Sequence, residues 1–352
     1  MLLIAVSGSV YGLKALNVQA EEIIYIRNDG TIDPSGTPIS TIDKVTYTFM
    51  DNIYSPIVVD RGNIVIDGNG YILQGTGTGS GFSLYGVSNV SIKNTNIKGF
   101  YFGICLNLTS NNVISENTIT ANTRGLIVST SSMNTIYRNN ITASTRYSVL
   151  LENSSSRNVI LENNISSLNF GVWLVGACNN TLCKNNVTSN LYGIILENSY
   201  NNTLLQNDVS NNKYGVLFSE SSGNVVSANT IAFNENYGIA LSKASNNTFY
   251  HNNLIDNGEQ LSFYESPVNV WDSGYPSGGN YWSDYRERYS NALEIDDSGI
   301  WNTPYVIDAS NADTYPLMSQ YVIPEFPSFL ILPLFMIATL LAVIVYRRRH
   351  SF

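Results

Sequence analysis

A repeat of 22 to 23 residues runs through most of this 352-residue chain and restricts what it can fold into. Each repeat has a glycine followed by an apolar–x–apolar triplet, and two further short apolar segments complete it. Alternation of this kind is typical of short strands. Three strands per repeat predict an all-β chain, a right-handed parallel β-helix of about nine rungs. The glycine column is Gly81, Gly103, Gly125, Ser148 (the one exception), Gly171, Gly193, Gly215 and Gly238.

A single rung cannot be stable alone. It buries about four inward side chains, worth roughly 1.5–3 kcal/mol each. Ordering its residues costs roughly 1–2 kcal/mol apiece in backbone entropy. Rungs must therefore stack, which adds hydrogen bonds between rungs and a continuous apolar interior. Because β-branched residues and Asn-rich turns are poor helix formers, the alternative of a helical solenoid is disfavoured.

Two columns of asparagine accompany the strands. Rungs about 4.8 Å apart let each amide bond to the next, and asparagine also tolerates tight-turn backbone angles. We interpret both columns as structural ladders rather than ligand sites, with Ile64–Gly70 as the first rung. The first column is Asn63, Asn89, Asn112, Asn134, Asn158, Asn180, Asn202, Asn224 and Asn247. The second is Asn69, Thr95, Asn117, Asn139, Asn163, Asn185, Asn207, Asn229 and Asn252.

A third column alternates in charge over four rungs. It predicts a ladder of exposed ion pairs, each worth about 0.2–1 kcal/mol, that keeps the rungs in register. Its members are Asn94, Glu116, Arg138, Glu162, Lys184, Gln206, Ala228 and His251.

The middle residue of the first strand in each repeat is expected to face outward, and most of these residues are apolar. A large exposed apolar patch usually has a covering partner. Either the C-terminal segment folds back over it, or the stripe around Trp173 is a ligand-binding or oligomer surface. The column is Ser83, Cys105, Ile127, Leu150, Trp173, Ile195, Leu217 and Ala240.

Both ends of the chain are typical of targeting segments. Residues 1–20 predict a signal peptide. The apolar run 326–346, followed by three arginines, predicts a transmembrane helix with its arginines in the cytoplasm. A net charge of −9 with few charged residues argues against a nucleic-acid partner. The predicted domains are the signal peptide (1–20), an N-terminal cap (21–62), the repeats (63–258), an aromatic-rich C-terminal β module (259–322) and a sorting motif, transmembrane helix and basic tail (323–352).

The repeat type "NNTLLQNDVSNNKYGVLFSESSGN" resembles the parallel β-helix repeat family that includes the nitrous-oxide-reductase maturation protein NosD and the carbohydrate-binding and sugar-hydrolase (CASH) domain. The segments "NVWDSGYPSGGNYWSDY" and "TPYVIDASNADTYPLM" are similar to the tail module of archaeal surface proteins of this group. Pro324-Glu325-Phe326, with the apolar run and arginines, resembles an archaeosortase signal. This resemblance implies an extracellular protein anchored to the membrane by the helix or by a replacement lipid.

NosD-type relatives are often labelled copper-binding, but copper sites need clustered His, Cys or Met. The two histidines, His251 and His350, and the three cysteines are scattered, so copper is not expected. Asp296 and Asp297 resemble the remains of a calcium loop, which Trp301 and Asn302 interrupt. We therefore expect no cofactor, with calcium as the remaining metal candidate.

Candidate site residues are few. Glu152 and Glu197 fall in one column two rungs, about 9.6 Å, apart, which suggests a weak catalytic pair for sugar hydrolysis. In the module, aromatic residues beside acids either hold a sugar or, as we prefer, form an aromatic core. The aromatic candidates there are Trp271, Tyr281, Trp282 and Trp301. Corner acceptors for N-glycosylation are Asn107, Asn153 and Asn179.

The sequence thus predicts a cell-surface parallel β-helix protein that binds a glycan, such as a surface polysaccharide or an envelope glycoprotein, without catalysis. The first alternative is a polysaccharide lyase or hydrolase. The second is a metal-delivery protein of the NosD kind.

Overall fold

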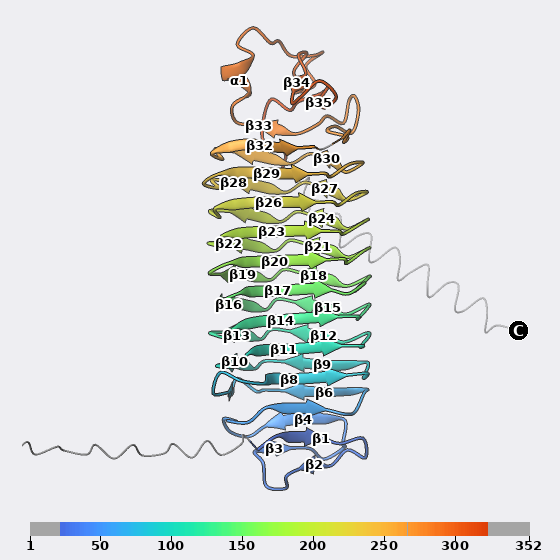
Figure 1. Cartoon of the computed structure of the whole chain (residues 1–352), viewed down its shortest axis with the longest axis vertical. Coiled ribbons are helices and arrows are strands. Elements are labelled where there is room, and N and C mark those ends of the chain that lie inside the picture. Colours follow the sequence, from blue (N-terminus) through green and yellow to red (C-terminus); the bar gives the residue numbers. More distant parts are fainter. Residues whose placement is uncertain (1–21, 266, 323–352) are drawn as a thin grey trace, which may run out of the picture.

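Three β-sheets stand side by side along one long axis in the computed structural model of the chain (Figure 1). The structure describes residues 22–265 and 267–322. Each rung passes through sheets A, B and C in turn, and the chain then returns to sheet A one rung further along. The predicted all-β parallel solenoid is confirmed.

The strands are short and repeat in the same order. Sheet A has 12 strands: β2 (Ile32–Asp33), β1 (Ile24–Ile26), β5 (Ile57–Val59), β8 (Ser80–Tyr85), β11 (Phe102–Asn107), β14 (Arg124–Ser129), β17 (Tyr147–Glu152), β20 (Phe170–Val175), β23 (Tyr192–Glu197), β26 (Tyr214–Ser219), β29 (Tyr237–Ser242) and β32 (Glu259–Tyr264). Sheet B has 11: β3 (Ile39–Ser40), β4 (Thr46–Phe49), β6 (Ile64–Asp67), β9 (Val90–Lys93), β12 (Val113–Ser115), β15 (Thr135–Tyr137), β18 (Val159–Leu161), β21 (Thr181–Cys183), β24 (Thr203–Leu205), β27 (Val225–Ser227) and β30 (Thr248–Tyr250). Sheet C has 10: β7 (Ile72–Gln74), β10 (Asn96–Lys98), β13 (Thr118–Thr120), β16 (Asn140–Ser144), β19 (Asn164–Ser167), β22 (Asn186–Thr188), β25 (Asp208–Ser210), β28 (Thr230–Ala232), β31 (Asn253–Ile255) and β33 (Tyr281–Trp282). The remaining elements are α1 (Tyr285–Arg288), β34 (Tyr305–Val306) and β35 (Ala312–Asp313).

The interior is a continuous apolar column. In one rung, Ile104 and Leu106 of β11, Ile114 of β12 and Ile119 of β13 point inward and are fully buried. The next rung repeats them in parallel register, with Ile104 beside Leu126 and Ile114 beside Ile136. This is the number of inward side chains that the sequence predicts for one rung.

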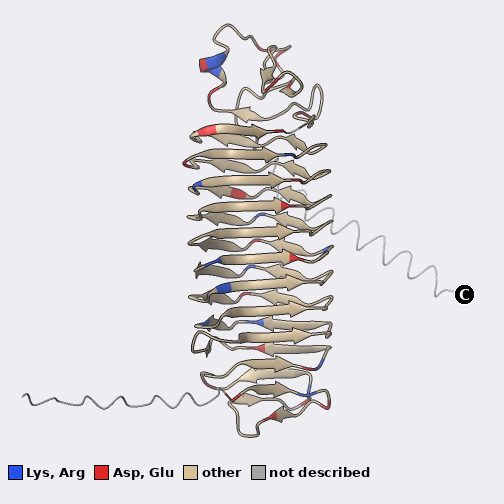
Figure 2. Ribbon diagram, in the orientation of Figure 1, with Lys and Arg blue, Asp and Glu red and all other residues tan. Residues whose placement is uncertain are grey.

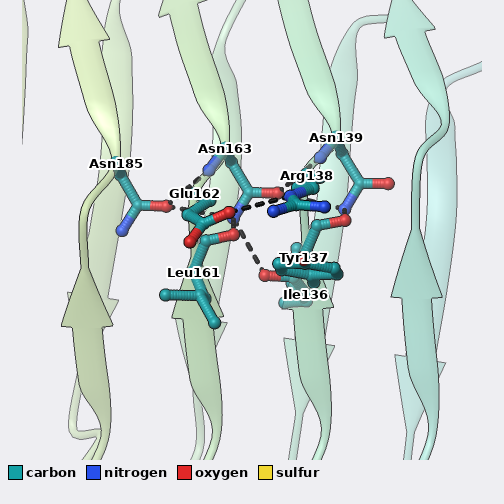
Figure 3. Close-up of polar contacts among 8 residues, drawn as sticks. All are labelled: Ile136, Tyr137, Arg138, Asn139, Leu161, Glu162, Asn163 and Asn185. Carbon is teal, nitrogen blue, oxygen red and sulfur yellow. Dashed lines mark hydrogen bonds and ion pairs between the residues drawn. The ribbon is translucent and has the colours of Figure 1, made fainter. Parts of the chain in front are cut away.

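Buried asparagines connect the rungs, and Figure 3 shows three members of the second ladder in line. The Nδ2 of Asn139 donates to Oδ1 of Asn163 at 3.0 Å, and the Nδ2 of Asn163 donates to Oδ1 of Asn185 at 3.0 Å. The backbone N–H of Asn163 also donates to Oδ1 of Asn185. Each side chain thus satisfies polar groups of its own and a neighbouring rung, which confirms the structural interpretation of both columns from Asn112 onward.

The predicted columns are wrong at three positions in the first two rungs, whereas Thr95 of the second column is buried as predicted. Asn63 and Asn89 bond to each other but lie at an exposed corner, and Asn69 is exposed too. The buried positions belong to Val90 and Thr95, whose backbone N–H groups donate to the first asparagine of each ladder. All three early asparagines have φ between 50° and 58°, so they occupy the left-handed corner position instead.

A third ladder, between sheets C and A, was not predicted. The Nδ2 of Asn190 donates to Oδ1 of Asn212 at 2.8 Å, and the series continues along the solenoid. Two serines, Ser144 and Ser167, interrupt it. Its asparagines are Asn122, Asn190, Asn212, Asn234 and Asn257.

The predicted ladder of ion pairs is reduced to one pair. Arg138 Nε lies 2.8 Å from Glu162 Oε2 (Figure 3), and Lys184 joins none of the ion pairs among the described residues. What the column shares is backbone conformation, with φ between 50° and 58° at every member. The N–H of Glu162 donates across this corner to the carbonyl of Cys183. Since that bond needs no particular side chain, the corner does not depend on alternating charge.

The two ends of the solenoid differ from the interior rungs. The segment predicted as an N-terminal cap, 21–62, already supplies parallel strands to sheets A and B, and its antiparallel strands β2 and β3 lie at their edges. At the other end, the module supplies the last acceptor of two ladders. Asn269 N–H donates to Asn311 Oδ1 at 2.8 Å, and Asn280 N–H donates to Asp313 Oδ2 at 2.7 Å.

The signal peptide predicted for 1–20 and the sorting motif and transmembrane helix predicted for 323–352 lie outside the described residues. Within the described part of the chain, no helix has the length and apolarity needed to cross a membrane.

The capping carboxyl of Asp313 predicts a pH dependence of stability. Its burial raises its pKa to about 7, against the opposing effect of N–H donors from Asn280 and Trp282. In the unfolded chain the pKa returns to its ordinary value near 4, so the folded state holds an extra proton between these values. We therefore expect thermal stability to fall as pH rises from about 4 to 7. Asp313→Asn should flatten that slope in melting curves, and an unchanged slope would contradict the assignment.

Candidate functional site

The outer surface of sheet A is the most distinctive face of the solenoid. The middle outward residues of its strands form one column in the register that the sequence predicts. On successive rungs the column contains Cys105, Ile127, Leu150, Trp173 and Ile195. Although these side chains point away from the interior, Ile127, Leu150 and Ile195 are at most 8 % exposed. Ile127 and Leu150 form a second, outer apolar cluster with Tyr147, and large side chains on adjacent rungs pack against it.

Aromatic rings line the edge of this face where the strands of sheet A begin. Phe170, Tyr192, Tyr214 and Tyr237 occupy one column, which we call the aromatic ladder. Ring centroids are 5.4 Å apart for Phe170–Tyr192 and 4.8 Å apart for Tyr192–Tyr214, and both pairs are stacked. Trp173 stacks on Phe170 at 4.8 Å. The sequence analysis missed this column, although an aromatic residue directly before the repeated glycine was its signal.

Carboxylates lie at the opposite edge, where the strands end. Glu152 and Glu197 are in one column two rungs apart, as predicted, and Val175 lies between them. Glu197 Oε2 accepts a hydrogen bond from Trp173 Nε1 at 3.2 Å. The face therefore has rings along one edge and hydrogen-bonding acids along the other, with apolar side chains between them.

Nucleophiles on this face are not activated. Burial raises the pKa of the Cys105 thiol to about 11, and the charge of Glu152 adds to the effect. Burial likewise raises the pKa of Tyr147 well above its ordinary value. Neither group provides an anion at neutral pH, so the face is equipped for stacking and hydrogen bonding rather than for attack by a thiolate or phenolate.

Two family profiles match this chain. That of the periplasmic copper-binding protein NosD matches residues 142–287, and that of the right-handed β-helix region matches residues 23–188. Together the two profiles cover residues 23–287, so the chain is similar to NosD-type right-handed β-helix proteins over most of its length. No curated protein sequence matches this chain.

Three solved structures that resemble this chain have names that identify them as enzymes. The A-module of mannuronan C-5 epimerase AlgE6 from Azotobacter vinelandii is 14 % identical, with a TM-score of 0.50 over 64 % of this chain and 75 % of that one. The periplasmic alginate epimerase AlgG is 15 % identical, with a TM-score of 0.43 over 64 % and 68 %. An alginate lyase from Paenibacillus sp. str. FPU-7 is 13 % identical, with a TM-score of 0.46 over 64 % and 91 %. At these identities the likeness shows the fold alone.

The NosD name implies a copper site. Among the described residues, no three His, Cys, Asp or Glu side chains gather where they could hold a metal ion. Asp296 and Asp297, the calcium candidates, are exposed at the tip of a tight turn and both have positive φ. Turn geometry accounts for these two residues, and they do not converge with a third carboxylate.

The aromatic candidates of the C-terminal module form its core. Trp271, Trp282 and Trp301 are at most 4 % exposed, so their ring faces are not available to a ligand. Trp282 stacks on Tyr305 at 4.1 Å, and its Nε1 donates to Asp313. Tyr281 is half-buried on β33. The interpretation of an aromatic core explains this part of the chain better than the sugar-binding one.

A cleft of about 480 Å³ lies between the last rung and the module. Asp284 is central to it, accepting a hydrogen bond from the Tyr305 hydroxyl at 3.0 Å and pairing with Arg288 at 2.7 Å. These groups satisfy one another within the module, and residues 256–261 of the last rung line the other side of the cleft.

The predicted glycosylation sites differ in accessibility. Asn179 is exposed at a corner, whereas Asn107 is half-buried. Asn153 is exposed, but its amide donates to Ser129 and Glu152. Glycosylation at these residues stays a prediction.

Proposed function

We propose that the outer face of sheet A binds a glycan chain that lies along the solenoid axis. The observation that carries this proposal is the aromatic ladder, four rings in one column with Trp173 beside them. Sugar rings pack their apolar faces on such rings, while their hydroxyls need acceptors. Glu152 and Glu197 supply acceptors across the face. Figure 2 shows few other charged residues along these strands.

The rest of the chain is consistent with a surface role. The module stacks on the end of the solenoid as far as residue 322 and extends sheet C, which leaves the sheet A face of the middle rungs open (Figure 1). The family profile describes a periplasmic protein, and the mannuronan epimerase shares the fold. An extracellular location, with anchoring through the C-terminal segment, is part of this proposal.

Tryptophan fluorescence tests the proposal directly. Of the four tryptophans, three are buried in the module, so quenching by acrylamide reports on Trp173. We expect a bound oligosaccharide to protect Trp173 from quenching. Tyr192→Ala should weaken binding about tenfold, because an aromatic contact contributes about 0.5–1.5 kcal/mol. The control is Tyr54→Ala, an exposed tyrosine near the N-terminal end. Equal affinities in the two variants would contradict the proposal.

The alternative is a sugar-cleaving enzyme, and the pairing of Glu152 with Glu197 in one column favours it. Their two-rung separation, about 9.6 Å, is close to the upper end of the range for inverting hydrolases, roughly 6.5–9.5 Å. If the protein released reducing sugars and Glu152→Gln abolished that release, the proposal of non-catalytic binding would be wrong and the protein would be a hydrolase. Binding without release supports the proposal.

A further inference from the structure

One member of the column at the start of the sheet A strands is not aromatic. Arg124 opens β14 and lies in register between Phe102 and Tyr147, two rungs before the aromatic ladder begins at Phe170. It is only 8 % exposed, although its column points outward. The structure therefore places a nearly buried guanidinium on the face that we propose binds glycans.

The surroundings of Arg124 are rings. Its guanidinium carbon is 3.9 Å from the ring centroid of Tyr101, 5.3 Å from that of Phe102 and 5.6 Å from that of Tyr147. Arg124 takes part in none of the ion pairs among the described residues. Its Nη1 is sealed from solvent and has no hydrogen-bond partner. Aromatic contacts thus hold the cation in place but give its N–H groups no acceptor.

The contacts around Arg124 do not fully compensate for the burial of its charge. Cation–π contacts offset only part of the cost of burying a charged donor that has no acceptor. The guanidinium fork matches the oxygens of carboxylate and sulfate groups. Arg146, directly before Tyr147, is exposed and adds a second positive charge one rung away.

We propose that Arg124 is an anion subsite of the glycan face and that the preferred ligand is an acidic glycan bearing carboxylate or sulfate groups. This inference rests on the proposed function. The acidic group binds the part of the guanidinium that reaches solvent on the sheet A face, while the sugar rings that follow pack along the aromatic ladder. Arg124 then determines specificity, and Phe170, Tyr192 and Tyr214 provide the contact area.

The test compares ligands with one backbone and different charge on the full-length protein. Oligogalacturonate carries carboxylates, and its methyl ester does not. For sulfate groups, the comparison is between dextran sulfate and unmodified dextran. We expect the wild type to bind one acidic ligand at least tenfold more tightly than its neutral form, with affinity falling as salt rises. Arg124→Gln should lose most of this preference yet keep the neutral affinity, and Arg124→Lys should recover only part of it.

Arg138→Gln is the matched control, because it removes the same charge from the sheet B corner, where Arg138 pairs with Glu162. It should leave the preference unchanged, and circular dichroism should show that each variant is folded. Equal wild-type binding of acidic and neutral ligands, or equal loss of both in Arg124→Gln, would overturn the anion subsite while the glycan face stands. Failure of every ligand to protect Trp173 would instead refute the proposed function.

Discussion

Asn180→Ala is expected to lower the free energy of unfolding by about 2–4 kcal/mol, because it leaves the buried N–H of Asn158 without a partner, at roughly 1–3 kcal/mol, and removes a second hydrogen bond worth about 1 kcal/mol. Asn180 Oδ1 accepts from the N–H of Asn158 at 2.9 Å, and its Nδ2 donates to the carbonyl of Ser155 at 3.0 Å. An alanine side chain replaces neither bond. The carbonyl of Ser155 keeps its bond from the N–H of Cys178, but the N–H of Asn158 is buried and its loss is not recovered by solvation.

The control is Asn186→Ala in the same rung. Asn186 is exposed and bonds through its side chain only to Asn164, at 3.0 Å. Its removal should change stability by less than about 0.5 kcal/mol. Because solenoid rungs contact only their neighbours, hydrogen exchange measured by mass spectrometry should show lost protection concentrated at the rungs of Asn158 and Asn180. Equal effects of the two variants would contradict the assignment of the buried ladder.

The repeat was sufficient to predict the rung, the glycine column and the outward stripe, because each depends on side-chain alternation within one strand. Positions at corners were harder to assign. In several rungs an exposed left-handed asparagine directly precedes the buried one, as at Asn179 and Asn180. Two adjacent asparagines therefore leave the register uncertain by one residue. In the first rungs only the exposed one remains, which is why Asn63 and Asn89 were misplaced.

The repeat pattern could not predict contacts between segments that are distant in the sequence. Asn269 reaches Asn311 across 42 residues, and Asn280 reaches Asp313 across 33. No repeat links these partners. At the site, Arg124 and Tyr101 lie on adjacent rungs, but neither belongs to the apolar columns on which the sequence analysis concentrated. The aromatic ladder, by contrast, was visible in the sequence, because its residues directly precede the last four glycines of the glycine column.

Gly193→Ala is expected to cost about 3–4 kcal/mol, more than most single substitutions, because the repeat leaves no space for a methyl group there. A Cβ on Gly193 would lie 2.6 Å from the carbonyl oxygen of Gly215 and 2.8 Å from a methyl carbon of Val209. Gly215 belongs to the next rung and Val209 to β25 of the same rung, so relief requires the rungs to separate and β25 to move outward. Urea unfolding of the variant measures the cost.

Ser148 shows how the same column can accept a side chain. It is fully buried in a 23-residue rung, where the pairing of β16 with β19 shifts between Ile141 and Ser144. The extra residue makes room, and the hydroxyl donates to the carbonyl of Ser166 at 2.7 Å. Ser148→Ala should therefore cost only about 1 kcal/mol, the net value of that hydrogen bond. If both alanines proved equally destabilising, steric exclusion by the neighbouring rung could not be the reason for the glycine column.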